Sequence, residues 1–170
     1  GYMKKIVGNY MEKIVSKNVK CHYCNNYSLK VLGNNTPSLD LKCTNCKNVN
    51  IECKSKCLSI NGDLPKDLFL PHGNFNEYIK RQNNGLDWII IIYKVNRLEK
   101  ILKIIKILYI KNKEILGSDN FKVIKKENSQ LSNITIKNHF LLNEIKLQKD
   151  YSFSFKNVYN TLVSRIRKIE

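Results

Sequence analysis

Long apolar runs are missing from this 170-residue chain. The longest, Trp88–Tyr93, has the length of one strand, whereas a membrane-spanning helix needs about 20 apolar residues. Internal repeats, linkers rich in proline, glycine or serine, and a secretory signal pattern are absent as well. We therefore expect one cytoplasmic domain over residues 1–170, without a membrane partner.

Acidic residues are scarce. The chain has 14 Asp and Glu against 30 Lys and Arg, which gives a formal charge of +16 and a pI near 9.6. Such an excess favours a polyanionic partner, because every phosphate that is neutralised releases counterions. Asn, Ile and Lys are abundant, as an AT-rich coding bias would also produce. The charge predicts a nucleic acid as a partner, and coding bias explains part of it.

The six cysteines predict a metal rather than disulfides, because a chain without a secretory signal belongs in a reducing compartment. Eighteen residues separate the pair Cys21/Cys24 from the pair Cys43/Cys46. Two Cys-x-x-Cys turns at this spacing predict a zinc ribbon over residues 21–46. Four thiolates close the coordination sphere, so this Zn²⁺ is expected to be structural.

Two further cysteines leave a second ligand set open. Cys43 and Cys46 could instead bind a metal together with Cys53 and Cys57. Against that set, strand alternation makes Cys53 a small buried thiol, and we expect Cys57 to be free. The three histidines show no ligand spacing.

Hydrophobic periodicity predicts an α/β domain built on a mixed sheet flanked by helices, with the zinc ribbon inserted in it. A first amphipathic helix should end near Asn18. Residues 98–110 fit a helix in their first half and a strand by Ile107. The other expected elements are short strands at 39–41 and 48–54, a loop at 59–74, a helix at 75–82, strands at 87–93 and 133–136, and a C-terminal helix at 158–166.

Two acids and a lysine lie in and after the ribbon: Asp40, Glu52 and Lys54. Alternation puts Glu52 and Lys54 on the same face of one strand. Mg²⁺ prefers oxygen ligands, so Asp40 and Glu52 could hold it, with the carbonyl of Cys53 as a third ligand. Lys54 could then orient an attacking water and stabilise charge on a phosphate. Glu12, on the first helix, is either a solvated acid or an accessory acid that faces this site.

The pattern Glu-x-Lys alone arises by chance in a lysine-rich chain, but the wider motif resembles a known family. The run Asn34-Asn35-Thr36-Pro37-Ser38-Leu39-Asp40, the second Cys-x-x-Cys pair and Glu52-Cys53-Lys54-Ser55-Lys56 are similar to the catalytic domain of DpnI-type restriction endonucleases, which are related to the Dam-replacing proteins. The Asp–Glu gap is one residue longer here, and Cys53 stands where the family has an apolar residue.

This resemblance implies a PD-(D/E)xK nuclease fold with catalytic Asp40, Glu52 and Lys54, a catalytic Mg²⁺, and hydrolysis of duplex DNA by a type II restriction enzyme. The type enzyme of the family carries a winged-helix domain and cuts GATC only when its adenine is methylated. We expect no such domain after Glu170, so a GATC-like site and the requirement for methylation are both left open. Phosphate contacts are expected from Lys56, Lys80 and Arg81, unless these side chains are simply solvated.

Two other functions fit parts of the pattern. A non-enzymatic zinc-ribbon module of a transcription or replication assembly would explain the charge and the cysteines. It would not explain two acids facing a phosphate. A nuclease directed at RNA or at DNA under repair would use the same residues. No motif indicates a small-molecule cofactor beyond the two metals.

Overall fold

The structure is a computed structural model that describes residues 2–33, 40–58, 63–115, 119–139, 142–147 and 150–156. Within these residues the helices are α1 (Tyr2–Asn18), α2 (Phe75–Asn83) and α3 (Asn112–Ile115). The strands are β1 (Leu29–Val31), β2 (Leu41–Cys43), β3 (Asn50–Cys57), β4 (Leu68–Asn74), β5 (Leu86–Asn96), β6 (Ile101–Ile110), β7 (Phe121–Lys125), β8 (Leu131–Ile136), β9 (Glu144–Ile145) and β10 (Ser152–Ser154).

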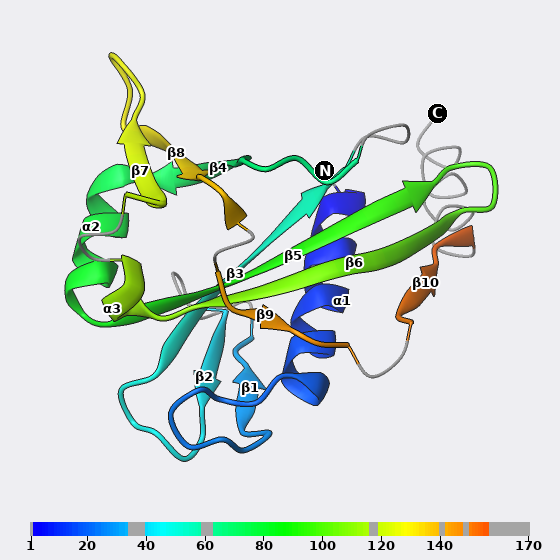
Figure 1. The fold of residues 1–170 in the computed structure, drawn as a ribbon, viewed down its shortest axis with the longest axis horizontal. Helices are drawn as coiled ribbons and strands as arrows, with labels where there is room; N and C mark the ends of the chain where they lie inside the picture. Colours follow the sequence, from blue (N-terminus) through cyan, green and yellow to red (C-terminus); the bar gives the residue numbers. More distant parts are fainter. Residues whose placement is uncertain are drawn as a thin grey trace, which may run out of the picture.

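The described strands form two sheets (Figure 1). The larger sheet has seven strands in the order β1-β2-β3-β5-β6-β10, and β9 pairs beside them with β6. Its β3–β5 pair is parallel and its other pairs are antiparallel. The smaller sheet is antiparallel, in the order β4-β8-β7. The expectation of an α/β chain with a mixed sheet is confirmed.

Strand β5 lies at the centre of the fold, and both of its faces are covered. Its residues Leu86–Ile92 are all buried. Ile89 and Ile91 pack into a core shared with α1 and the cysteine ribbon, whereas Trp88 and Ile90 pack into a second core formed with α2 and the smaller sheet. A strand buried on both sides needs a continuous apolar run, which is what the sequence supplies here.

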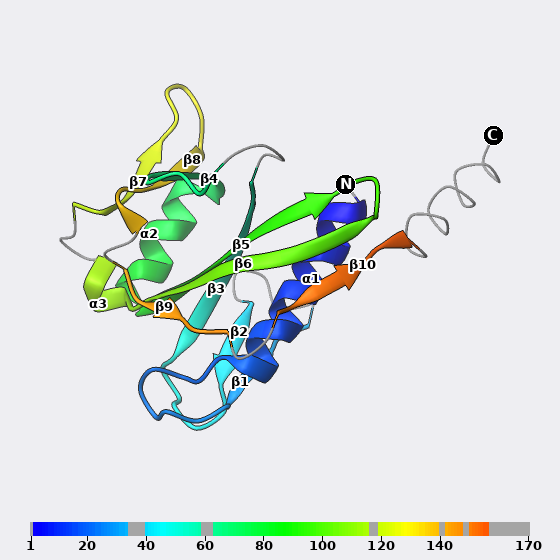
Figure 2. The same cartoon turned by 45° about the vertical axis from the view of Figure 1, so that its right-hand side comes forward.

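Helix α1 covers one face of the larger sheet (Figure 2). Met11 and Val15, four residues apart, are 1% and 0% exposed and enter the first core, as does Val19 just after the helix. Residues at this spacing share one side of a helix. The expected end at Asn18 is confirmed.

Helix α2 follows β4 and is capped at both ends. The side chain of Asn74 accepts hydrogen bonds from the backbone N–H groups of Asn76 and Glu77, at 2.9 and 3.2 Å. Such an N-cap satisfies donors that have no partner within the helix. Gly85 follows with a φ of 85°, a conformation that favours glycine. The predicted helix at 75–82 is therefore confirmed.

The predicted loop at 59–74 is wrong in its second half, because Leu68–Asn74 form β4. Pro71 and Gly73 suggested a loop, but β4 is an edge strand of its sheet and the pairing shifts between His72 and Asn74. Edges and bulges tolerate proline and glycine. Residues 59–62 lie outside the described part.

The region 98–110 is a strand from Ile101 onward, so a strand at Ile107 is confirmed and the helical alternative is wrong. Strand pairing with β5 outweighs the helical spacing of its first half.

The strand expected at 39–41 begins at Leu41, and the one at 48–54 extends from Asn50 to Cys57. The strand expected at 133–136 is confirmed within β8. The expected C-terminal helix at 158–166 lies outside the described residues.

In the described part of the chain, no helix combines the length and the apolarity that a membrane span requires.

Candidate active site and zinc site

The four cysteines of the two Cys-x-x-Cys pairs converge. Their Sγ atoms all lie within 4.8 Å of one another, and Cys24 Sγ is 3.8 Å from Cys43 Sγ. Tetrahedral zinc with Zn–S bonds of about 2.3 Å separates its sulfur atoms by about 3.8 Å. The backbone N–H of Cys46 also donates to Cys43 Sγ at 3.3 Å. The thiol set therefore fits a tetrahedral metal ion such as zinc.

The alternative ligand set is wrong. In the described chain, the cluster consists of Cys21, Cys24, Cys43 and Cys46, and neither Cys53 nor Cys57 belongs to it. Cys53 packs at the side of the first core. Cys57 is exposed, and its thiol donates to the carbonyl of Leu58 at 3.5 Å.

The second cysteine pair begins at the end of β2, where Cys43 is the last residue, and Cys46 lies in the connection to β3. These strands pair with Leu41 opposite Ile51. The turn between them is closed by the backbone N–H of Cys43, which donates to the carbonyl of Val49 at 3.1 Å, and by the N–H of Val49, which donates to the carbonyl of Cys46 at 3.3 Å. A metal held by this turn would therefore fix the β2–β3 hairpin.

Asp40 lies at the first residue before β2 and is bound to β3 twice. Its backbone N–H donates to the carbonyl of Ile51 at 3.1 Å. Its Oδ2 atom accepts the backbone N–H of Cys53 at 2.8 Å. The carboxylate of Asp40 is thus held beside the segment that carries Glu52 and Lys54.

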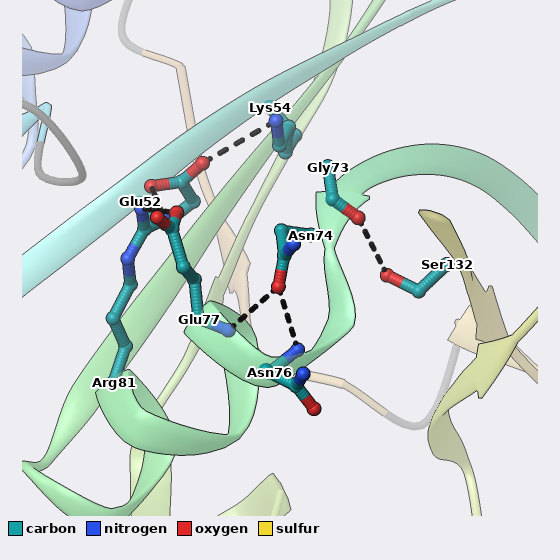
Figure 3. A network of polar contacts seen from close by, with 8 residues as sticks. All are labelled: Glu52, Lys54, Gly73, Asn74, Asn76, Glu77, Arg81 and Ser132. Carbon is teal, nitrogen blue, oxygen red and sulfur yellow. Dashed lines mark hydrogen bonds and ion pairs between the residues drawn. The ribbon is translucent and has the colours of Figure 1, made fainter. Parts of the chain in front are cut away.

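Glu52 is 6% exposed and pairs with two cations. Its Oε1 atom lies 3.3 Å from Lys54 Nζ, and its Oε2 atom lies 3.6 Å from Arg81 Nη1 (Figure 3). Lys54 comes from the same face of β3, as alternation predicted, and Arg81 reaches across from α2.

Glu12 on α1 is the third carboxylate of this cluster. Burial, the negative charges of Asp40 and Glu52, and a hydrogen bond to Asp40 raise the pKa of Glu12 to about 7. A protonated Glu12 donates that hydrogen bond, which acts to lower the pKa of Asp40. Glu12 is thus not a simply solvated acid but lies beside Asp40 and Glu52, whereas its role as an accessory acid stays a prediction.

Burial is the main cause that raises the pKa values of both Asp40 and Glu52, because it disfavours their charged forms. The charges of Lys54 and Arg81 act in the opposite direction on both groups. Three half-buried or buried carboxylates against two cations leave a net negative charge when all are ionised. Carboxylate oxygens are the ligands that Mg²⁺ prefers, so a magnesium ion at this cluster stays a prediction.

In the part of the chain that is described, the four cysteines are the one group of three or more His, Cys, Asp or Glu side chains that is arranged to hold a metal ion. Glu12, Asp40 and Glu52 do not form such a group. Of the expected phosphate contacts, Lys56 is half-buried on the same strand as Glu52, Lys80 is exposed, and Arg81 lies within the cluster.

The sequence did not predict that Arg81 pairs with Glu52, and it left the role of Glu12 undecided. The signal for Glu12 is its position next to Met11, at the border of the buried face of α1. Arg81 sits in the same way between Tyr78 and Gln82, which are buried on α2. A charged residue at the edge of an apolar helix face points along the protein surface and can reach a neighbouring strand.

A buried polar network joins the first cysteine turn to the sheet. Asp87 is 1% exposed and accepts hydrogen bonds from the hydroxyls of Tyr23 and Tyr109, at 3.2 and 3.1 Å, and from the backbone N–H of Asn112, at 2.7 Å. The ring of His22 stacks on Tyr109 with centroids 3.7 Å apart. The residues between Cys21 and Cys24 are thereby anchored on β5 and β6.

No protein-family model matches this chain, and no curated protein matches its sequence.

Proposed function

We propose that this protein is a Mg²⁺-dependent DNA endonuclease with a PD-(D/E)xK fold of the DpnI type, acting as a type II restriction enzyme. The observation that carries the proposal is the cluster of Asp40, Glu52 and Lys54 on the β2–β3 hairpin. A metal-dependent phosphodiesterase needs carboxylates that bind a cation and a lysine beside the attacking water. The sheet order, with parallel β3 and β5 at the centre, is compatible with that fold.

The roles follow from the chemistry of each group. Asp40 and Glu52 would hold Mg²⁺, and Glu12 lies close enough to Asp40 to take part. The metal would supply charge neutralisation at the scissile phosphate and a lowered pKa of the attacking water. Lys54 would orient that water and stabilise the charge that develops on the phosphate. Hydrolysis joins the water oxygen to phosphorus and breaks the P–O3′ bond, which leaves a 5′-phosphate and a 3′-hydroxyl.

The charge of the chain supports a nucleic acid as substrate. A formal charge of +16 attracts a polyanion over long range, and that attraction weakens with salt. Three of its acids, Glu12, Asp40 and Glu52, lie together within this basic chain. A binding module would gain nothing from burying carboxylates where phosphates approach, because such burial costs free energy.

A plasmid digest tests the proposal. Zinc-loaded protein is incubated with matched adenine-methylated and unmethylated plasmids, in Mg²⁺ or in EDTA, and the products are mapped for 5′-phosphate ends. We expect discrete, Mg²⁺-dependent fragments. Absence of cleavage on both plasmids in Mg²⁺ contradicts the proposal. RNA and branched DNA offered in parallel reveal a nuclease that acts on those substrates instead.

A second candidate function is a zinc-ribbon module that binds nucleic acid without cleaving it. The converging cysteines and the basic charge favour it as strongly as they favour the nuclease. It predicts DNA binding that is independent of Mg²⁺ and that leaves every substrate intact. The same digest, combined with a gel-shift measurement in EDTA, separates the two functions.

A further inference from the structure

Arg81 connects a buried carboxylate to an exposed one. Its Nη1 atom lies 3.6 Å from Oε2 of Glu52, and its Nη2 atom lies 3.0 Å from Oε2 of Glu77 (Figure 3). The side chain of Glu52 is 9% exposed and that of Glu77 is 63% exposed. The guanidinium therefore has one acceptor inside the cluster and another at the protein surface.

The backbone of Arg81 is fixed while its side chain keeps a choice of partner. Its neighbour Gln82 is buried, accepts a hydrogen bond from Trp88 Nε1 at 3.1 Å and donates one to Asn112 Oδ1 at 2.9 Å. Tyr78, one turn earlier, is 6% exposed and packs in the second core. These anchors hold α2 in place. A change of partner at Arg81 would involve only the rotation of its side chain.

The two contacts of the guanidinium are unequal. At 3.0 Å the contact with Glu77 is a hydrogen-bonded ion pair, whereas 3.6 Å to Glu52 is attraction without a hydrogen bond. Glu52 already has Lys54 at 3.3 Å. A divalent metal ion at Glu52 would be repelled by both Lys54 and Arg81. Arg81 is held more weakly by Glu52 than Lys54 is, so Arg81 is the cation that can move away.

We propose that Arg81 is a positioning residue that competes with the divalent metal for Glu52 and turns toward Glu77 and a DNA phosphate when the metal binds. The inference rests on the proposed function in one respect, namely that Glu52 is a metal ligand. Arg81 then links the two binding events. It occupies Glu52 while the metal is absent, and it becomes available to the substrate when the metal is present.

Metal binding without DNA provides the first test. Zinc-loaded protein is titrated with Ca²⁺ and with Mg²⁺ in a calorimeter, and these oxygen-seeking ions do not compete for thiolates. Arg81→Ala should bind the metal about tenfold more tightly than the unaltered protein, because a competing cation is gone. Glu77→Gln should bind it several-fold more weakly, because Arg81 loses its outer partner and stays on Glu52.

The matched control is Lys80→Ala, which removes the same charge from the adjacent, exposed position on α2. Its metal affinity should change less than twofold. Arg81→Lys serves as a second variant, since lysine keeps the charge but cannot span both carboxylates, and its affinity should fall between those of Arg and Ala. Metal affinity that is unchanged or weaker in both Arg81 variants overturns the inference.

DNA binding provides the second test. Fluorescence anisotropy is measured on a short duplex in EDTA and in Ca²⁺. Arg81→Ala should match the unaltered protein in EDTA and bind about tenfold more weakly in Ca²⁺. An equal loss in both conditions overturns the inference, because Arg81 would then contact phosphate regardless of the metal.

The nuclease activity and the role of Arg81 are tested independently by these measurements. If the metal affinities shift as expected but no nucleic acid is cleaved in Mg²⁺, the nuclease proposal falls and the competition at Glu52 stands. If DNA is cleaved and the metal affinities do not shift, only the role of Arg81 falls. A protein that binds neither Ca²⁺ nor Mg²⁺ overturns both.

Discussion

The Oδ2 atom of Asp40 accepts the backbone N–H of Cys53 at 2.8 Å. Cys53 stands between Glu52 and Lys54, so one hydrogen bond ties the first acid to the segment that carries the second acid and the lysine. A carboxylate that accepts a backbone N–H is held in one orientation. The relative position of the three groups is therefore set by the backbone of the β2–β3 hairpin rather than by flexible side chains.

This arrangement predicts that the acids and the lysine can be altered without loss of the fold. Asp40→Asn keeps an oxygen that can accept the N–H of Cys53 but removes the charge that a cation needs. DNA cleavage should fall at least about 100-fold, as it should in Lys54→Ala. Cleavage is measured on plasmid DNA, and binding on a short duplex should survive in both variants.

Lys42→Ala is the control for these variants, because Lys42 is exposed on β2 of the same hairpin. It should cut at nearly the normal rate and melt at nearly the normal temperature. An Asp40→Asn protein that cuts DNA at the normal rate would exclude Asp40 from the active site.

The β2–β3 hairpin was predictable because its signals are local. Alternation along a strand puts Glu52 and Lys54 on one face, and Cys-x-x-Cys spacing identifies a metal turn before any fold is known. Strand β4 was not predictable in the same way. Its Pro71 and Gly73 indicate a loop, and only its position at a sheet edge makes them acceptable in a strand.

The rest of the site depends on tertiary structure. Glu12 and Asp40 are 28 positions apart, and Glu52 and Arg81 are 29 positions apart. No periodicity in the sequence relates residues so distant from one another. Their proximity results from α1 and α2 packing against the larger sheet, each with a charged residue at the border of its apolar face.

Zinc removal should abolish activity by unfolding the hairpin. Cys43→Ser should lose bound zinc, measured by atomic emission, and cleave DNA at least about 100-fold more slowly, since metal binding at such turns supplies folding free energy. Cys57→Ser is the control and should keep both properties, because Cys57 lies outside the cluster. Stripping Mg²⁺ should be reversible, whereas stripping zinc should not. Full activity in Cys43→Ser would separate the ribbon from the catalytic site.

The Asp87 network should contribute to stability and to zinc retention. Tyr109→Phe leaves the ring in place but removes a buried donor to Asp87, which should lower the free energy of unfolding by about 1–2 kcal/mol. Zinc should also be released faster to a chelator, since Asp87 anchors Tyr23 beside Cys24. Tyr27→Phe is the control because Tyr27 is 54% exposed. Equal urea midpoints for the two variants would show that the Asp87 network does not contribute to the free energy of unfolding.

The raised pKa of Glu12 predicts how stability depends on pH in the absence of Mg²⁺. Below about pH 4.5 the carboxyl is protonated in both the folded and the unfolded chain. Between about pH 4.5 and 7 the unfolded chain ionises while the folded one keeps its proton, so this group makes stability fall as pH rises. Above pH 7 both states are ionised and the loss is complete.

Glu12→Gln, which stays neutral, should therefore be more stable relative to the unaltered protein at pH 8 than at pH 5, as measured by urea denaturation of zinc-loaded protein. Glu127→Gln, on an exposed position, should show no such change. Adding Mg²⁺ at pH 8 should stabilise the unaltered protein more than Glu12→Gln, because the cation offsets a charge that the variant lacks. A stability difference that stays constant from pH 5 to 8 would mean that Glu12 does not share the charge of Asp40 and Glu52.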